Sequence, residues 1–242
     1  MRPFLTARWE SLVLLNYACP RALLDPLVPA GTRLDSWDGE ALISLVGFLF
    51  RDTRVRGLAI PFHTTFEEVN LRFYVLRETP EGERRRAVVF IREIVPKAAI
   101  AFVARTIYGE PYRAVPMSHE VALDANTGGT AEYRCRHAGG EFRMAATVAG
   151  AARASPAGSE AEFITEHYWG YTRRRYGHTT EYRVEHPRWA LWSAPSASFS
   201  GPAASLYGPS FAEILSAPPR SAFVAVGSDV AVYPGRRLNA GL

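Results

Sequence analysis

The segment from Thr65 to Arg77 constrains the fold more than any other part of the chain, because polar and apolar residues alternate along it. The polar side chains take every second position, at Glu68, Asn70, Arg72 and Tyr74. The positions between them are apolar, at Val69, Leu71, Phe73 and Val75. Since successive side chains of a β-strand point to opposite faces, this pattern predicts a strand with a polar ladder on one face. A turn at 79–83 and a second strand at 87–91 complete a predicted antiparallel hairpin.

Other segments also predict strands. The nearly continuous apolar run Ala41–Phe50 is typical of a core strand buried on both faces. One further hairpin is predicted from Glu132–His137 and Phe142–Val148, around the turn 138–140. Another is predicted from Glu162–Tyr171 and Thr179–His186.

Helices are expected to be few. Proline and glycine positions predict them at Pro20–Pro29, Lys97–Tyr108 and Phe211–Ser216. The stretch Trp192–Pro209, rich in Ser, Ala, Gly and Pro, predicts a long irregular connection. Because the chain shows no internal repeat and no long linker, residues 1–242 are expected to form a single, mainly β domain of the α+β class.

Charge and cysteine content limit the partners and the compartment. Lys97 is the only lysine among 28 basic residues, and the arginine runs at 84–86 and 173–175 lie near glycine or acidic residues. We expect those runs in solvated turns, so nucleic acid is not an expected partner. Cys19 and Cys135 fit no paired-cysteine pattern, and no stretch reaches the ~18–20 apolar residues of a membrane span. The sequence therefore predicts a cytoplasmic protein with no membrane partner.

Several phrases, in a consistent order along nearly the whole chain, resemble one known family. They are Ala7-Arg8-Trp9, residues 20–34, Asp38-Gly39, residues 66–72, residues 108–112, Tyr171-Thr172-Arg173 and His186-Pro187. Together they resemble the YqjF-like conserved proteins, an uncharacterised family with a domain of unknown function grouped with the acetoacetate decarboxylase superfamily. The resemblance implies an acetoacetate decarboxylase-like antiparallel β barrel or cone around an internal cavity, with a few peripheral helices. It implies no activity.

The decarboxylases of that superfamily end a helix with Gly, an aromatic residue, Pro and two lysines. The first lysine forms a Schiff base with the keto acid, and the second lowers its pKa. The matching phrase here is Gly109-Glu110-Pro111-Tyr112-Arg113. A phenol forms no imine and arginine stays protonated, while Lys97 lies well upstream near the expected helix start. A Schiff-base decarboxylase is therefore not expected, and whether the chain is an enzyme stays open.

The resemblance places candidate site residues on the polar ladder and after the helix. Glu68 matches an acidic pocket position, and Asn70 and Arg72 would share its face; the alternative is a solvent-facing stripe of an amphipathic strand. Inside a barrel, a Glu–Arg pair must be satisfied by each other or by a ligand. Tyr112 offers a directional hydroxyl and Arg113 a planar fork for a carboxylate or phosphate. The alternative for Tyr112 is a core aromatic with its hydroxyl at the surface.

Glu93, beside Arg92 at the end of the second hairpin strand, completes the candidate ligand-binding set, although charged strand ends are often solvated. Possible pocket walls are Trp9, Tyr17, Phe48, Trp169 and Trp189, which are more often core residues. The six histidines are isolated in sequence, so no metal is expected. No cofactor motif is found, and a homo-oligomer is possible because the decarboxylase relatives are oligomers.

These residues leave three functions open. The first is a pocket that binds a small apolar molecule with a carboxylate or carbonyl head. The second is a lyase, hydratase or isomerase that uses Glu68 as general base and Tyr112 as proton donor. The third is a scaffold whose cavity is filled by its own side chains and whose surface carries an apolar patch.

Overall fold

The computed structural model describes residues 1–103, 105–106, 109–137, 140–174 and 177–238. Its larger sheet contains thirteen of the described strands. They are β1 (Leu5–Ala18), β2 (Arg33–Leu34), β3 (Leu42–Val55), β4 (Leu58–Ala59), β5 (Phe66–Glu78), β6 (Arg84–Val95), β7 (Tyr112–Ala114), β11 (Arg153–Ala154), β12 (Trp169–Arg173), β13 (Thr179–Glu185), β14 (Ala190–Ser193), β16 (Ser221–Val232) and β17 (Arg236–Arg237). The predicted hairpin is confirmed as β5 and β6, and the predicted core strand is confirmed as part of β3.

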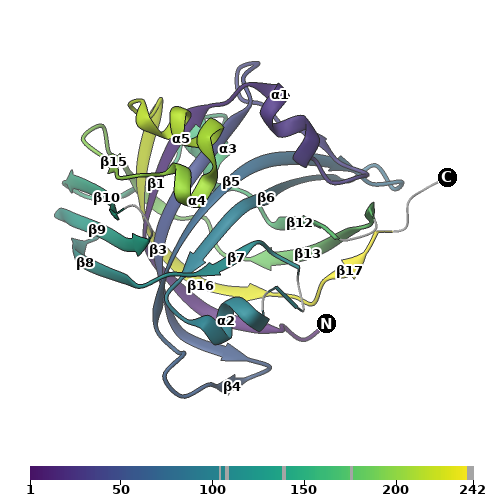
Figure 1. Cartoon of the computed structure of the whole chain (residues 1–242), viewed down its shortest axis with the longest axis horizontal. Helices are drawn as coiled ribbons and strands as arrows, with labels where there is room; N and C mark the ends of the chain where they lie inside the picture. Colours follow the sequence, from purple (N-terminus) through teal and green to yellow (C-terminus); the bar gives the residue numbers. More distant parts are fainter. Residues whose placement is uncertain (104, 107–108, 138–139, 175–176, 239–242) are drawn as a thin grey trace.

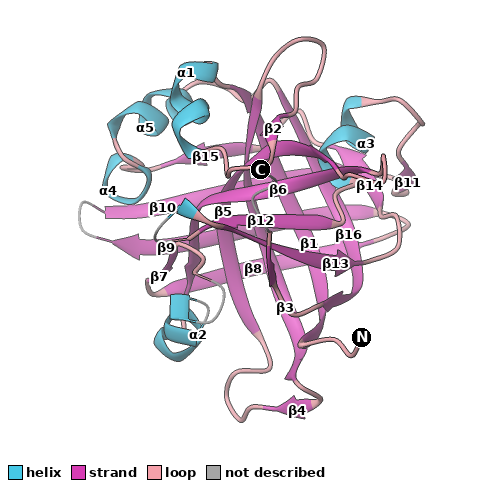
Figure 2. Ribbon diagram, turned by 90° about the vertical axis from the view of Figure 1, so that its right-hand side faces the viewer, coloured by secondary structure: helices cyan, strands magenta, loops and turns pink. Residues whose placement is uncertain are grey.

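The larger sheet closes on itself, as Figure 2 shows. Its neighbouring strands run β16-β1-β3-β5-β6-β12-β13, and β13 then pairs with β16 through Val184↔Val232 and Glu185↔Ala231. The expected barrel is therefore confirmed. It departs from a purely antiparallel barrel at β6, which pairs in parallel with both β12 and β7. The sequence pattern predicts no strand at residues 221–232, yet β16 closes the barrel.

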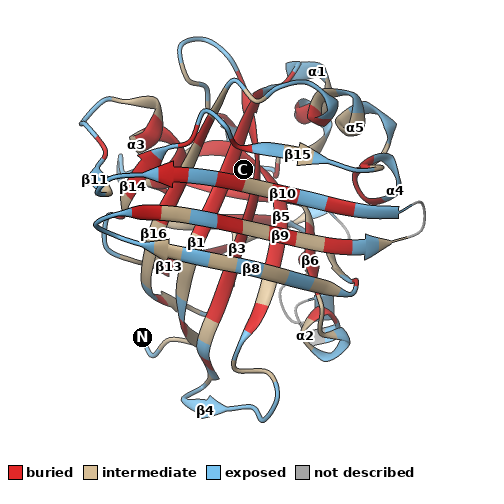
Figure 3. Ribbon diagram, turned by 90° about the vertical axis from the view of Figure 1, so that its left-hand side faces the viewer, coloured by how far each residue is buried: buried red, intermediate tan, exposed pale blue. Residues whose placement is uncertain are grey.

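A second, four-stranded sheet packs outside the barrel across β1 and β3 (Figure 3). Its strands are β8 (Met117–Asp124), β9 (Gly128–His137), β10 (Gly140–Ala149) and β15 (Ser198–Ser200). Burial alternates along β9 and β10, which confirms their predicted hairpin; residues 138 and 139 of the turn lie outside the described residues. A side chain at Gly47 would approach the Tyr133 ring to 2.9 Å, so this glycine lets the two sheets touch. The resulting core contains Val69, Leu71 and Phe73, the apolar face of β5.

The described helices are short and peripheral (Figure 1). They are α1 (Arg21–Leu24) with the 3-10 turn η1 (Asp25–Leu27), α2 (Ala98–Val103), α3 (Glu160–Thr165), α4 (Ala204–Tyr207) and α5 (Pro209–Ser216). The helices predicted at 20–29 and 211–216 are confirmed. The helix predicted at 97–108 is present as α2, and residues 104, 107 and 108 of that prediction lie outside the described residues.

Three predictions from local pattern are wrong. The strand expected from Glu162 is the helix α3 over its first half, because the Ser159 hydroxyl caps it by accepting from the Glu162 N–H at 3.2 Å. The connection expected at 192–209 contains β15 and α4 as well as the end of β14. The arginine run 84–86 begins β6 instead of forming a solvated turn; the Arg85 guanidinium lies 4.0 Å from the centroid of the Trp169 ring and pairs with a buried carboxylate.

Candidate functional site

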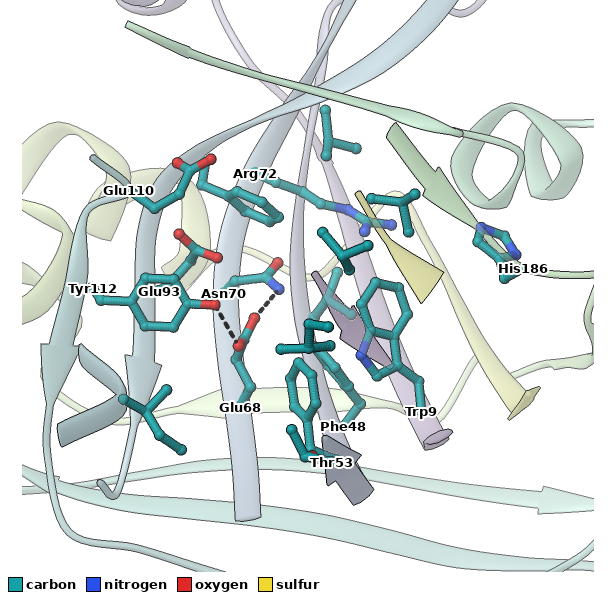
Figure 4. Close-up of a pocket in the computed structure, with 18 of the residues that line it drawn as sticks. Trp9, Phe48, Thr53, Glu68, Asn70, Arg72, Glu93, Glu110, Tyr112 and His186 are labelled. Carbon is teal, nitrogen blue, oxygen red and sulfur yellow. Dashed lines mark hydrogen bonds between the residues drawn. The ribbon is translucent and has the colours of Figure 1, made fainter. Parts of the chain in front are cut away.

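Three adjacent strands place polar side chains in one row inside the barrel. The register pairs Asn70 on β5 with Glu93 on β6, and Glu93 with Tyr112 on β7. Glu68 lies two residues before Asn70 on the same face of β5. Figure 4 shows these four side chains converging, with Glu110, from the segment before β7, beside them. Residues distant in sequence thus form one polar group, buried except for the half-buried Tyr112, which we call the acid cluster: Glu68, Asn70, Glu93, Glu110 and Tyr112.

The acid cluster lies at one side of a cavity of about 360 Å³. Most of the remaining wall is apolar and aromatic: Trp9, Phe48, Phe50, Phe66, Trp169 and Trp189 are among the lining residues. The rings pack on one another, with centroids 5.3 Å apart for Trp9 and Phe48 and 4.6 Å for Phe50 and Phe66. Exposed Ile60 and part-exposed His63 also line the cavity, so it reaches the surface beside β4. A cavity of this size and lining is typical of a small-molecule site.

Hydrogen bonds within the acid cluster converge on Glu68. The Tyr112 hydroxyl donates to one carboxylate oxygen at 2.9 Å, and the Asn70 amide N–H donates to the other at 3.0 Å. Glu68, Asn70 and Glu93 are each 2% exposed, which excludes the solvent-facing stripe as an interpretation of this face. Two acceptor oxygens, Asn70 Oδ1 and Glu93 Oε2, have no hydrogen-bond partner among the described residues.

Burial controls the proton affinity of the three carboxyl groups. It raises the pKa of Glu68 to about 7, although the hydrogen bonds from Asn70 and Tyr112 and the charge of Arg72 act in the opposite direction. Burial likewise raises the pKa of Glu110 to about 7 against hydrogen bonds with Thr172 and Tyr182. The pKa of Glu93 lies well above its ordinary value because burial and the neighbouring charges of Glu110 and Glu68 all favour the neutral form. The cluster therefore holds exchangeable protons near neutral pH.

The cavity lining also carries nitrogen-bearing side chains beyond the acid cluster. The Arg72 guanidinium donates to the Ile164 carbonyl oxygen at 3.3 Å, whereas its Nε has no partner among the described residues. His167 is 7% exposed, and neither of its ring nitrogens has a partner there. Burial is the main reason that the pKa of His167 lies well below its ordinary value, so this ring is neutral. Arg72 and His167 together offer buried N–H and ring-nitrogen groups to a ligand.

The structure brings five of the six candidate ligand-binding residues together and separates the sixth. Glu68, Asn70, Arg72, Glu93 and Tyr112 all line the cavity. Arg113 does not: it follows Tyr112 on β7, so its side chain points to the other face, where it donates to the Ser205 carbonyl oxygen at 3.2 Å.

The other residues singled out from the sequence divide in the same way. Trp9, Phe48, Trp169 and Trp189 line the cavity, whereas Tyr17 belongs to the core between the sheets. Arg92 and Lys97 are not among the lining residues, although Ala99 and Ile100, close to Lys97 in sequence, are. The one amine-bearing side chain of the chain is thus placed outside the cavity wall.

Sequence reasoning missed part of the site. Glu110, Tyr182, His167 and Thr165 line the cavity and were not candidates. Glu110 stood within the Gly-Glu-Pro phrase, and the unusual acidic residue there was the one available signal. Gly170 has a structural role that the sequence did not indicate, because a Cβ at this position would meet the Tyr182 ring at 2.2 Å. It allows the Tyr182 hydroxyl to reach Glu110.

Among the described residues, no three His, Cys, Asp or Glu side chains gather in an arrangement that could hold a metal ion. In the same ranges, no helix has the length and apolar character needed to cross a membrane.

Comparison with solved structures identifies the fold. An enduracididine biosynthesis enzyme, MppR, in complex with pyruvate aligns with a TM-score of 0.70 at 13% identity, covering 99% of this chain and 92% of that one. Acetoacetate decarboxylase from Legionella pneumophila aligns with a TM-score of 0.66 at 14% identity, covering 98% and 87%. An acetoacetate decarboxylase-like enzyme from Sphingomonas wittichii RW1 gives 0.67 at 16% identity, covering 99% and 94%. The fold is therefore acetoacetate decarboxylase-like.

Sequence comparison gives a closer relationship. The uncharacterized protein YqjF of Bacillus subtilis (strain 168) is 30% identical over 118 residues, which are 48% of this chain. The aligned part spans about half of that relative, 47% of its length. The model of the family DUF2071, described as an uncharacterized conserved protein, matches residues 6–229. The chain therefore belongs to this family.

Proposed function

We propose that the cavity binds a small, largely apolar molecule and orients it through a carboxylate or carbonyl group. The observation that carries this proposal is the partly unsatisfied Arg72 guanidinium inside an aromatic cavity, because a buried charged donor without a partner is costly unless a ligand completes it. A carboxylate matches the planar fork of arginine, and the aromatic rings would bury the apolar body. The pyruvate complex of MppR, a fold relative, supports a keto acid as one ligand class.

The test is a thermal-shift and calorimetric screen of keto acids, aromatic acids and fatty acids. Binding should raise the melting temperature of the wild type, and Arg72→Gln should weaken it by about tenfold or more, since a charge-assisted hydrogen bond contributes about 1.5–3 kcal/mol. Arg113→Gln is the matched control, because this arginine lies on the same wall of the barrel but outside the cavity. If no acid stabilises the wild type, or if both variants behave alike, the proposal is wrong.

A second candidate function is acid–base catalysis without a Schiff base, as in a lyase, hydratase or isomerase. The specific observation is the 2.9 Å hydrogen bond that the Tyr112 hydroxyl donates to Glu68. Burial of Glu68 raises the pKa of its carboxyl group to about 7. Glu68 would remove a proton beside a substrate carbonyl, and Tyr112 would supply one to the oxygen.

This candidate predicts exchange of α-protons with deuterium in keto acids incubated with the protein, followed by NMR. Glu68→Gln should abolish the exchange, while Glu67→Gln should preserve it, because Glu67 bonds His119 outside the barrel at 2.6 Å. Borohydride trapping in the same mixture checks the alternative chemistry: a covalent adduct on Lys97 would show that a Schiff base forms after all.

A further inference from the structure

The acid cluster has more hydrogen-bond acceptors than its neighbours satisfy. The Tyr112 hydroxyl has one proton for two carboxyl groups, Glu68 at 2.9 Å and Glu93, and one N–H of Asn70 goes to Glu68. Asn70 Oδ1 and Glu93 Oε2 are buried acceptors without a partner among the described residues. Leaving such an atom buried and unbonded costs about 1–3 kcal/mol. Asn70 Oδ1 is an acceptor at any pH, and Glu93 becomes acceptor-only when it ionises, so a donor on a ligand would complete this side of the cavity.

Charge leads to the same conclusion. Three carboxyl groups, Glu68, Glu93 and Glu110, influence one another electrostatically in the same buried region. The charge of Arg72 offsets that of Glu68 in part, and a second carboxylate ionises there at low cost only if a further cation enters. A ligand carbonyl would bring only another acceptor, whereas a primary ammonium brings three N–H donors and a positive charge.

The geometry points to a ligand with a primary ammonium group, held by Glu68, Glu93 and Asn70, whose apolar body lies against the aromatic wall. The inference rests on the proposed function in one respect, since it takes the cavity as the binding site. It goes further by naming the head group that the acid cluster would hold, next to Arg72 (Figure 4). A molecule that carries both a carboxylate and an ammonium, such as an apolar amino acid, engages both sides.

Three probes with the same phenyl body separate the two head groups. Phenethylamine carries an ammonium, 3-phenylpropanoate carries a carboxylate, and phenylalanine carries both. We expect phenethylamine and phenylalanine to raise the melting temperature. Calorimetry should show that Asn70→Ala, which removes the acceptor, and Glu93→Gln, which cannot ionise beside the ammonium, each weaken phenethylamine binding by about tenfold, the equivalent of one hydrogen bond to a charged group. Glu67→Gln, outside the cavity, is the control that should bind phenethylamine as the wild type does.

The pH dependence adds a readout that simple packing would not move. An alkylammonium stays protonated below pH ~10, whereas Glu68 and Glu110, with pKa values of about 7, lose their protons as the pH rises. The affinity for phenethylamine should therefore increase from pH 5.5 to 8, by up to about tenfold per pH unit for each proton released. The affinity for 3-phenylpropanoate should not increase over that range.

The possible failures differ. If 3-phenylpropanoate binds through Arg72 and neither amine binds, the ammonium site is wrong and the proposed function stands. If phenethylamine binds equally well to the wild type, Asn70→Ala and Glu93→Gln, the amine is held elsewhere and the inference is overturned. If none of the three probes binds, the inference fails together with the aromatic-acid form of the proposed function.

Discussion

Two places in this barrel bury carboxyl groups, and they satisfy them in opposite ways. Glu181 on β13 is fully buried and accepts hydrogen bonds from the Tyr171 hydroxyl at 2.7 Å, Arg77 at 2.9 Å, Arg85 at 2.8 Å and Arg236 at 2.7 Å. Burial acts to raise its pKa, but the bonds from Tyr171, Arg236 and Arg85 hold that pKa below the ordinary value. This carboxylate is charged at neutral pH, and both of its oxygens accept hydrogen bonds.

In the acid cluster, by contrast, neutral groups donate the hydrogen bonds: Tyr112 and Asn70 to Glu68, and Thr172 to Glu110. Burial raises the pKa values of Glu68 and Glu110, because their hydrogen bonds are too weak to offset the loss of hydration. A buried carboxyl group whose pKa is lowered by arginine partners has a structural role, whereas one whose pKa is raised by burial is available to a ligand. Glu181 joins β5, β6, β13 and β17 through its arginines, while the acid cluster keeps protons and acceptor atoms that a ligand can use.

The largest expected effect is at Glu181. Glu181→Gln should lower the free energy of unfolding by about 3–5 kcal/mol, because Arg77 and Arg85 are largely buried and would lose their counter-charge. Urea denaturation measures it. Glu185→Gln on the same strand is the control: its side chain is 39% exposed, so its pair with Arg183 should contribute less than about 1 kcal/mol. Equal losses in the two variants would contradict a structural role specific to Glu181.

Gly170→Ala tests how the barrel supports the acid cluster. The added methyl group would meet the Tyr182 ring within 2.5 Å, so the ring must move away from Glu110. We expect a loss of about 1–3 kcal/mol in unfolding free energy, as for other overpacked sites. The tyrosine movement should appear as a changed Tyr182 environment by NMR. An unchanged stability and spectrum would show that the ring position is not restricted by residue 170.

The pH dependence of stability should distinguish the two sites by its sign. Glu68 has a pKa raised from 4.5 to about 7, so the native state binds more protons than the unfolded state between those values, and stability falls as the pH rises through this window. The slope is at most about 1.4 kcal/mol per pH unit for one group. The pKa of Glu181 is lowered, so the stability that Glu181 contributes is lost as the pH falls below 4.5, the ordinary pKa of a glutamate.

Urea unfolding at pH 3, 4, 5, 6, 7 and 8 measures these slopes by difference. The unfolding free energy of the wild type minus that of Glu68→Gln should change between pH 4.5 and 7 and stay constant above pH 7. The corresponding subtraction for Glu67→Gln should not show this change. If the difference in unfolding free energy between the wild type and Glu68→Gln does not change with pH, burial does not raise the pKa of Glu68.

The smallest stability effect is expected at Glu93. Its pKa lies well above the ordinary value, so the native side chain is neutral near pH 7 and Glu93→Gln replaces one neutral group by another of the same shape. The unfolding free energy should change by less than about 1 kcal/mol. Set beside the loss at Glu181, this result would show that the two buried acids differ in role. A loss near that of Glu181→Gln would remove the distinction.

Local pattern predicted the parts of this protein whose neighbours lie close in sequence. The alternation at 65–77 was sufficient for β5 and for the division of its residues between core and cavity. Pattern failed at α3, where the Ser159 cap and the acidic first turn favoured a helix over the predicted strand. It also failed at Arg113, which the family phrase had indicated as a site residue. Successive side chains of β7 point to opposite faces, so Arg113 points away from the cavity into which Tyr112 points.

The sequence by itself determined that the chain is mainly β, that one face of β5 is polar, and that a tyrosine, Tyr112, follows the Gly-Glu-Pro phrase. These properties depend on residue type and on a two-residue period, which are local. Only the tertiary structure decided that Glu68, Glu93 and Glu110 share one buried region, because closure of the barrel through β13 and β16 and the parallel pairing of β6 with β7 bring them together. Desolvation then sets their protonation, and it depends on how the whole barrel encloses them.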